Sequence, residues 1–272
     1  MSSGLKGSFP FRLGTTSYIL PDDILPNVEF LAPLVDDIQL VLFESEEISN
    51  LPNENTLARL SELAANSELS YTVHLPLDAE LGSANETTRR NSVAMCRRVT
   101  ELTAPLEPIA WNLHLGGRQR GDRPAEDLGG WRSALSRSLD ELLPAVPDSR
   151  RLAAETLDYP LELVEELIEE FDLSVCMDVG HLLMNDRSLD EAVSHFGPRC
   201  RVVHLHGIRE GRDHRDIAAL PDGTVKGVLE MLGAGDAAEK VLTIEVFSLD
   251  DFEKSMRHLA RISSQGALTC RP

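Results

Sequence analysis

The chain has 272 residues and a mass of 30.0 kDa, which suits one large domain or two modest ones. Hydrophobic residues make up 42%, enough for a sizeable core, so the composition excludes a disordered or fibrous chain. The 45 Asp and Glu residues outnumber the 26 Lys and Arg residues, and the net charge of −19 argues against binding to nucleic acid, since that affinity comes mostly from basic side chains on phosphates.

Short apolar runs typical of buried parallel strands alternate with amphipathic, helix-like segments along the chain. The expected strands lie at 11–17, 37–43, 71–76, 110–115, 151–157, 174–180, 201–207 and 241–247. The expected helices lie at 21–34, 53–67, 86–102, 130–146, 160–171, 188–197, 223–235 and 248–262. Ser188 with Glu191, and Ser248 with Asp251, have the spacing of helix N-terminal caps.

This alternation amounts to roughly eight β/α units in succession, the number that closes a TIM barrel. We therefore expect an α/β fold of the (β/α)8 type, in which residues 11–272 form a single catalytic domain after a short polar tail of residues 1–10. The long loops at 76–86, 116–130 and 207–222 would then stand over the catalytic face. A doubly wound sheet is the main alternative.

The sequence shows neither a recognisable targeting signal nor a CxxC pair of cysteines. No apolar run approaches the roughly 18–20 residues that span a bilayer, and the first residues do not resemble a signal peptide. The cysteines are scattered and read as reduced thiols: Cys96, Cys176, Cys200 and Cys270. We expect a cytoplasmic protein that does not contact membranes.

Metal-ligand residue types interrupt the apolar pattern at the ends of six consecutive expected strands. They are His74, His114, Glu155, Asp178 with His181, His204 with His206, and Glu245. Taken singly, each could have a purely structural role as a buried, hydrogen-bonded or ion-paired side chain. Together they predict a metal site, because buried charges are costly unless they are paired or metal-bound and because barrel enzymes place their sites at these ends. His206 is the weaker candidate, since it shares a face with His204 and can instead orient a ligand.

The mixture of nitrogen and oxygen donors suits zinc, manganese or iron rather than calcium, and zinc or manganese is our first expectation. A bridging carboxylate such as Glu155 would hold two ions about 3.5–4 Å apart, an arrangement used in phosphoester hydrolysis. The residues alone therefore predict metal-dependent hydrolysis or isomerisation.

The strand-end motifs resemble those of the xylose-isomerase-like barrel superfamily, which includes endonuclease IV-type nucleases and sugar-phosphate isomerases and epimerases. They are HLP at 74–76, NLHLGG at 112–117, AETL at 154–157, MDVGH at 177–181, VHLHG at 203–207 and IEVF at 244–247. The resemblance to the nucleases implies one ion on His74, His114 and Glu155, and a second on Glu155, Asp178, His204 and Glu245. It implies a third on His181 with an Asp-x-His pair, but Asp213 and His214 are adjacent here, so that third ion is in question.

The amino-terminal segment at 9–52, followed by YTVHLPLD at 71–78, resembles the cobamide-remodelling phosphodiesterases (CbiR). This resemblance implies hydrolysis of the nucleotide-loop phosphoester of an adenosylated cobamide, which releases adenosylcobinamide phosphate and the α-riboside of the lower base. It implies catalytic roles for Glu155, His181 and Glu245, with either Asp213 or His214 as a further ligand. Candidate substrate contacts are Arg12, Tyr18, Phe43, Glu44, Arg118 and Arg120, each of which also fits an ordinary surface or packing role.

Three other functions remain open at this point. A sugar-phosphate isomerase or epimerase would use Glu155 and Glu245 across one ion. An abasic-site nuclease would need a basic rim, which the net charge of −19 opposes. A barrel that only sequesters a cobamide would not need so many metal donors. We expect a small-molecule partner, and the oligomeric state is undetermined.

Overall fold

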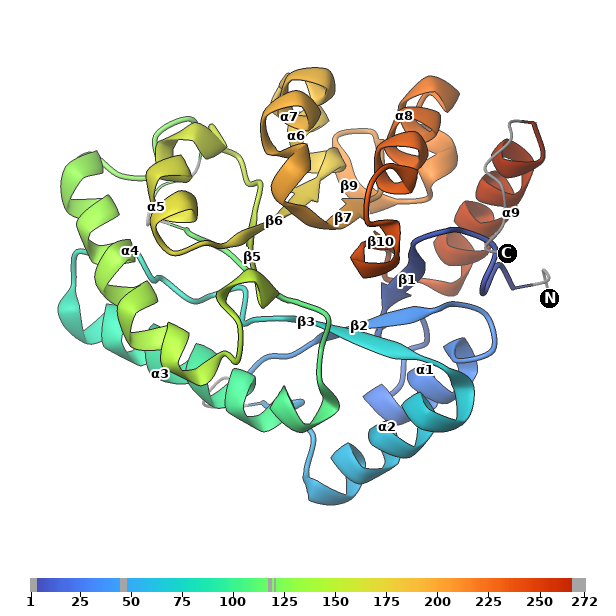
Figure 1. The fold of residues 1–272 in the computed structure, drawn as a ribbon, viewed down its shortest axis with the longest axis horizontal. Coiled ribbons are helices and arrows are strands. Elements are labelled where there is room, and N and C mark those ends of the chain that lie inside the picture. The colour runs from blue at the N-terminus through green and yellow to red at the C-terminus, as the bar shows by residue number, and fades with distance from the viewer. Residues whose placement is uncertain (1–3, 45–47, 117–118, 120, 266–272) are drawn as a thin grey trace.

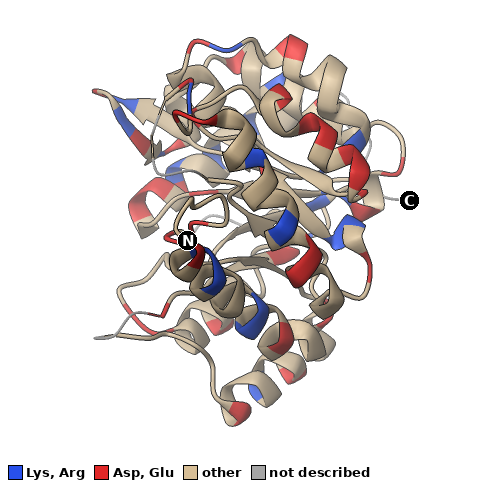
Figure 2. Cartoon of the chain, turned by 90° about the vertical axis from the view of Figure 1, so that its left-hand side faces the viewer, with Lys and Arg blue, Asp and Glu red and all other residues tan. Residues whose placement is uncertain are grey.

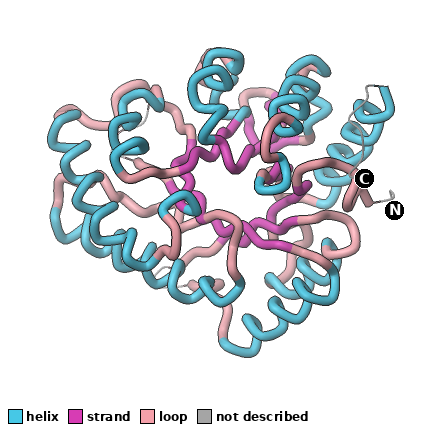
Figure 3. Tube along the Cα trace, in the orientation of Figure 1, coloured by secondary structure: helices cyan, strands magenta, loops and turns pink. Residues whose placement is uncertain are grey.

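The computed structural model describes residues 4–44, 48–116, 119 and 121–265. Within these ranges, eight parallel strands close into a barrel in the order β1-β10-β7-β6-β5-β4-β3-β2. The strands are β1 (Arg12–Thr16), β2 (Asp37–Val41), β3 (Ser70–His74), β4 (Trp111–Leu113), β5 (Leu152–Glu155), β6 (Ser174–Asp178), β7 (Cys200–Leu205) and β10 (Val241–Ile244). Viewed down its axis, the barrel is the central ring of strands in Figure 3. The predicted single-domain TIM barrel is confirmed.

The helices surround this ring, as Figure 1 shows. They are α1 (Ile24–Leu31), α2 (Glu54–Ser67), α3 (Glu86–Thr103), α4 (Leu128–Leu142), α5 (Glu165–Glu170), α6 (Val179–Met184), α7 (Leu189–Phe196), α8 (Asp222–Gly233) and α9 (Leu249–Gln265). Ser188 caps α7 as its spacing predicts, because its side chain accepts a hydrogen bond from the Glu191 N–H. The helices bury apolar side chains against the outer face of the strands, and closure of the barrel buries the inner face, which also carries polar side chains such as Gln39 and Asn112.

Two local elements differ from the expected ones. The strand expected at 174–180 ends at Asp178, because the Asp178 side chain accepts the His181 N–H at 2.7 Å and so begins α6. The loop expected at 207–222 contains an antiparallel hairpin of β8 (Gly207–Arg209) and β9 (Arg212–Arg215). Short polar strands of this kind lack the apolar alternation by which strands are recognised in sequence.

Residues 4–10, part of the segment expected to be a polar tail, pack against the amino-terminal end of the barrel. Phe9 is 1% exposed and stacks on Phe11 with ring centroids 5.1 Å apart. The Lys6 ammonium donates to the carbonyls of Ala32 and Val35 at 2.9 and 3.0 Å. The apolar ring of Phe9 makes this segment part of the core rather than of the solvent-exposed surface.

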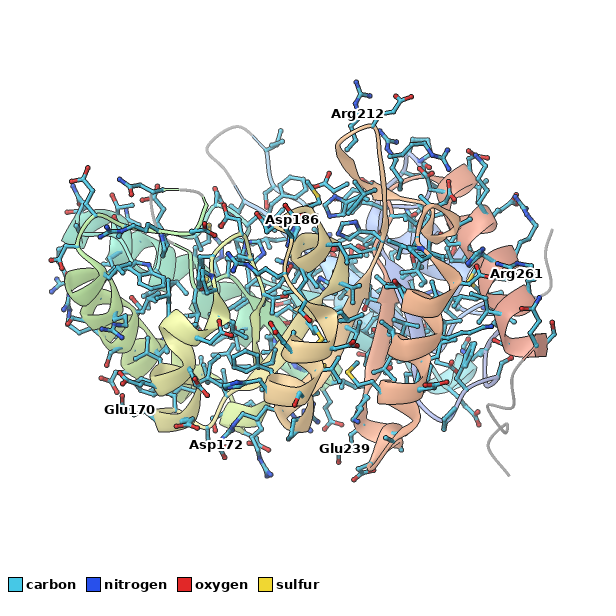
Figure 4. The ribbon with its side chains drawn as sticks, turned by 90° about the horizontal axis from the view of Figure 1, so that it is seen from above. Glu170, Asp172, Asp186, Arg212, Glu239 and Arg261 are labelled. Atoms are coloured by element: carbon cyan, nitrogen blue, oxygen red, sulfur yellow. The ribbon has the colours of Figure 1, made fainter. Side chains whose placement is uncertain are left out.

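The two ends of the barrel are distinct in Figure 4, where Asp186 and Arg212 mark the carboxyl-terminal face and Glu170, Asp172 and Glu239 mark the opposite face. Figure 2 shows acidic and basic residues interspersed along the outer helices, so acidic residues are not confined to the metal-ligand positions. None of the helices in the described part of the chain is long and apolar enough to cross a membrane.

Candidate metal centre

The carboxyl-terminal ends of the strands bring the predicted metal-ligand side chains together. His74, Glu155 and Asp178 are each the last residue of their strand, so the barrel closure places them at the same height. The remaining members of this set either lie within β7 or follow β4 and β10 directly: His204, His114 and Glu245. All are buried except His114, which is 18% exposed. The structure thus brings the side chains of this set together.

Glu155 lies between two groups of imidazoles and presents one carboxylate oxygen to each. Its Oε2 lies 3.1 Å from His74 Nε2 and 3.4 Å from His114 Nε2. Its Oε1 lies 3.4 Å from His204 Nδ1. A carboxylate shared in this way is the geometry of a ligand that bridges two ions.

A second group of donors surrounds the Nδ1 atom of His204. Glu245 Oε2 lies 3.3 Å from this nitrogen and Asp178 Oδ2 lies 3.8 Å from it. The two oxygens of Asp178 have different surroundings, because Oδ1 accepts the backbone N–H of His181 at 2.7 Å while Oδ2 faces the imidazoles. Glu155, Asp178, His204 and Glu245 can therefore surround one cation.

Hydrogen bonds to the outer nitrogen of each ring leave the inner nitrogen available to a cation. His74 Nδ1 lies 2.7 Å from the carbonyl of Leu75, so it keeps a proton, and Nε2, which is hydrogen-bonded to Glu155 in the ion-free protein, has a lone pair for a cation once its own proton leaves. His204 Nε2 lies 2.7 Å from the amide oxygen of Gln39, which leaves Nδ1 as the lone pair. These contacts match the way proteins orient metal-binding histidines.

The β8–β9 hairpin adds His214 to the rim of this cluster. His214 Nε2 lies 3.5 Å from Glu245 Oε2, while its Nδ1 lies 3.2 Å from Asp213 Oδ1. Asp213 is 42% exposed, and among the two residues only His214 faces the cluster. The geometry therefore favours His214 as the ligand candidate and gives Asp213 the role of orienting its ring. His181 lies on the other side, with Nδ1 3.4 Å from Asp178 Oδ2.

Several buried nitrogen and oxygen atoms of the cluster have no hydrogen-bond partner and are suited to bind divalent cations. His114 Nε2, Asp178 Oδ2, His204 Nδ1 and Glu245 Oε2 are all buried without a hydrogen-bond partner. Burying such atoms without partners is costly, and their convergence from different strands concentrates that cost at one place. Cations in the two groups that share Glu155 would satisfy all of them, so the described residues suit divalent metal ions.

The electrostatics of the cluster follow from burial and from close opposite charges. Burial alone would raise the pKa of Glu155, but His204 and His114 hold the pKa of Glu155 well below its ordinary value. Burial likewise opposes the charged form of His214, yet Glu245 and Asp213 raise the pKa of His214 from 6.5 to about 9. In the absence of ions the carboxylates are therefore paired with imidazolium groups, so a cation must displace protons on binding.

The predicted substrate contacts fall into three groups. Tyr18 and Phe43 follow β1 and β2 on the metal-site face, with ring centroids 6.4 Å apart, and Glu44 there pairs with Arg98 at 2.5 Å. Arg12 was placed wrongly at the site, because it is the first residue of β1 and so lies at the opposite end of the barrel. Arg118 and Arg120 lie outside the described residues.

Sequence reasoning missed two amides inside the barrel. Asn112 Nδ2 donates to Gln39 Oε1 at 2.9 Å, and the Gln39 amide in turn lies 3.5 Å from Glu245 Oε1. Gln39 thereby connects His204 to Glu245 beneath the cluster. The signal was available, since an uncharged amide in a strand as apolar as DIQLV must find buried partners.

Known proteins resemble this chain in family and in fold. A family model described as a xylose isomerase-like TIM barrel matches residues 35–262. A D-tagatose 3-epimerase-like protein is similar in structure, with a TM-score of 0.74 and 20% identity, covering 94% of this chain and 100% of the other. The 3-keto-D-glucoside 4-epimerase from E. coli has a TM-score of 0.71 and 18% identity, covering 93% and 99%. Endonuclease IV from Thermus thermophilus has a TM-score of 0.70 and 16% identity, covering 94% and 100%. No curated protein sequence matches the chain.

Proposed function

The chain belongs to the xylose isomerase-like TIM barrel family, and we propose that within this family of metal-binding barrels it is a phosphodiester hydrolase of adenosylated cobamides. It would hydrolyse the phosphoester of the nucleotide loop and release adenosylcobinamide phosphate with the α-riboside of the lower base. The proposal has two parts, the reaction and the substrate, which depend on different observations.

The division of the Glu155 carboxylate between two groups of histidines carries the proposed reaction. Glu155, Asp178, His204 and Glu245 suffice to hold one ion. His74 and His114 then form an additional group around the other oxygen of Glu155, at 3.1 and 3.4 Å. Two ions on a shared carboxylate suit an in-line displacement at phosphorus, in which both the attacking and the leaving oxygen need stabilisation.

The residues of the chain have distinct tasks in this reaction. When bound, divalent ions would supply Lewis acidity and a nucleophile derived from water at neutral pH. Glu155 and Glu245 hold the negative charge that attracts the ions, while Gln39 fixes the ring of His204. His181 and His214 are 23% and 28% exposed, so they are the imidazoles that a bound phosphate can reach from solvent.

Exposed apolar side chains around the metal centre support a large, partly apolar substrate. In the described ranges, the exposed large hydrophobic residues are Ile48, Leu77, Met184, Phe247 and Leu249. All follow the carboxyl ends of strands, with Leu77 three residues after His74 and Phe247 two residues after Glu245. The Phe247 ring centroid lies 5.1 Å from that of His214. Exposed apolar side chains on the segments that follow the strand ends, with Phe247 against His214, favour a ligand with an apolar body, as the amino-terminal resemblance to cobamide phosphodiesterases implies.

A sugar-phosphate isomerase or epimerase is the alternative, and one observation favours it. Glu155 Oε1 and Glu245 Oε2 both lie near His204 Nδ1, at 3.4 and 3.3 Å, so the two carboxylates could serve a sugar bound to a single ion. In that one-ion reaction, however, His74 and His114 would have no metal ion to bind. Abasic-site cleavage is disfavoured by the net charge of −19.

The test is to incubate the protein, loaded in turn with Zn²⁺, Mn²⁺, Co²⁺ or Fe²⁺, with adenosylcobalamin and to identify the products by chromatography and mass spectrometry. We expect adenosylcobinamide phosphate and the α-riboside in equimolar amounts. Absence of both products with every metal would refute the cobamide assignment. Epimerisation of a ketose under the same conditions would favour the alternative.

A further inference from the structure

His206 is a fully buried imidazole at the metal centre whose two nitrogens have different partners. The backbone N–H of His214 points at His206 Nδ1 at 3.0 Å. The same Nδ1 lies 3.4 Å from the Gly207 carbonyl, and Nε2 faces the Asp178 carboxylate. The ring is thus turned the opposite way to that of His204, where Nε2 faces Gln39 and Nδ1 faces the carboxylates.

We infer that His206 is a positioning residue that holds Asp178 and His214 in place. Its Nε2 lies 3.2 Å from Asp178 Oδ1, a close contact that is not aligned as a hydrogen bond. Its Nδ1 lies 3.0 Å from the backbone nitrogen of His214. The ring therefore contacts one oxygen of Asp178, and Oδ2 is left to face the other imidazoles.

The backbone of His214 shows why such a support is needed. Its φ angle is +52°, in the left-handed region that residues other than glycine adopt at a cost. The His206 ring accepts the N–H of this residue and stacks on its imidazole, with centroids 4.4 Å apart and planes 18° apart. His206 therefore stabilises the conformation in which the β8–β9 hairpin directs His214 toward Glu245.

Gly180 in α6 provides the space in which the His206 ring lies. A Cβ atom at position 180 would lie 2.0 Å from His206 Cε1, closer than any real contact. Alanine would otherwise favour the helix more than glycine does. The glycine of the MDVGH motif is thus explained by the position of a side chain that lies on another strand.

A double-mutant cycle tests this inference without any substrate. Zn²⁺ affinity is measured by competition with a chelator for Gly180→Ala, His206→Ala and the double variant. Each single change should weaken binding of the ion at Asp178 by about 10–100-fold, as for other residues that orient ligands. In the double variant the added Cβ meets no ring, so its affinity should equal that of His206→Ala alone.

Gly223→Ala is the matched control, because Gly223 is likewise the second residue of its helix and an added Cβ there meets nothing within 4 Å. Trypsin cleavage of the ion-free protein after Arg209, Arg212 and Arg215 provides a second readout, since a hairpin released by His206 should be cut faster. Additive effects, loss of a whole ion at saturating Zn²⁺ in His206→Ala, or a Gly180→Ala protein that behaves like Gly223→Ala would overturn the inference. This inference rests on the metal centre of the proposed function, but the result is independent of whether the substrate is a cobamide.

Discussion

Glu155 is the residue on which both halves of the metal centre depend. Its Oε2 faces His74 and His114, and its Oε1 faces His204. It is 1% exposed and ends β5, so the strand positions it and solvent does not compete for its oxygens. A change of this carboxylate should therefore affect both proposed ions together.

Glu155→Gln should reduce the bound metal and lower turnover of the proposed substrate by at least about 10³-fold, because an amide supplies neither the charge nor the second ligand oxygen. Metal content by mass spectrometry and single-turnover assays would measure the two effects. Glu170→Gln is the control, since this exposed residue lies at the opposite end of the barrel (Figure 4). Near-normal turnover in Glu155→Gln would show that the site is misplaced.

His214 should make the stability of the ion-free protein depend on pH. Its pKa is raised from 6.5 to about 9, so its protonated form stabilises the fold fully below pH 6.5 and this contribution is lost as the pH rises through about 9. We expect unfolding by urea with a chelator present to show a loss of the order of 2 kcal/mol over this range. His214→Asn should diminish the loss, and an unchanged pH profile in that variant would contradict the assignment.

Metal affinity should change with pH in the opposite direction. Since the imidazolium proton of His214 must leave before Nε2 can bind a cation, affinity for Zn²⁺ should rise from pH 6.5 toward pH 9. Titration with a chelator of known pH dependence would measure this trend. A flat profile would mean that His214 is not a ligand.

The residue types at the centre were predictable from sequence, but the roles of individual atoms were not. Histidines and carboxylates stand out against apolar strands, so His74, Glu155 and Asp178 were found by their position at strand ends. Whether Asp213 or His214 faces the cluster depends on the hairpin and on a positive φ angle, neither of which has a sequence signal here. Arg12 was misplaced because it was chosen from the amino-terminal resemblance, although its place at the start of the expected strand at 11–17 already puts it at the amino end of the barrel.

At the scale of elements, the β8–β9 hairpin and the segment before β1 are the two additions to a plain barrel. The hairpin carries His214 to the metal face, and the segment at residues 4–11 covers the opposite end. Strands that alternate with helices were predictable, because the apolar period is repeated along the chain. The β8–β9 hairpin was not predictable, because its residues are mainly charged and its pairing depends on the turn at Gly211, where φ is +70°.

Phe9→Ala should destabilise the protein by about 3 kcal/mol, because removal of this buried ring leaves a cavity beside Phe11. Urea unfolding would measure the change. Leu77→Ala is the control, since Leu77 is 59% exposed and its truncation should cost less than about 0.5 kcal/mol. Equal stability of the two variants would mean that residues 4–10 contribute nothing to the core.

At the scale of the whole molecule, an acidic surface surrounds a site built for cations. Acidic residues are spread along the outer helices in Figure 2, so the net charge of −19 does not come from the metal centre alone. Such a surface repels polyanions more strongly than the small phosphodiester of the proposed function, which carries one negative charge. The sequence predicted this distinction from composition alone, because net charge does not depend on the fold.

The protein should therefore not retain abasic duplex DNA at about 0.1 M salt, since no net basic surface is available to release counterions. Gel-shift titration with metal-loaded protein would test this. Binding that weakens steeply with salt would contradict the expectation and would favour a nuclease.

The number of bound ions tests the account most directly. Protein saturated with Zn²⁺ or Mn²⁺ and freed of excess ion should contain at least two ions per chain by elemental mass spectrometry. The double variant His74→Ala and His114→Ala should lose one of them, whereas His195→Ala, which removes an exposed imidazole paired with Glu165, should lose none. A single ion per wild-type chain, unchanged in the double variant, would contradict the shared-carboxylate centre and would favour the isomerase alternative.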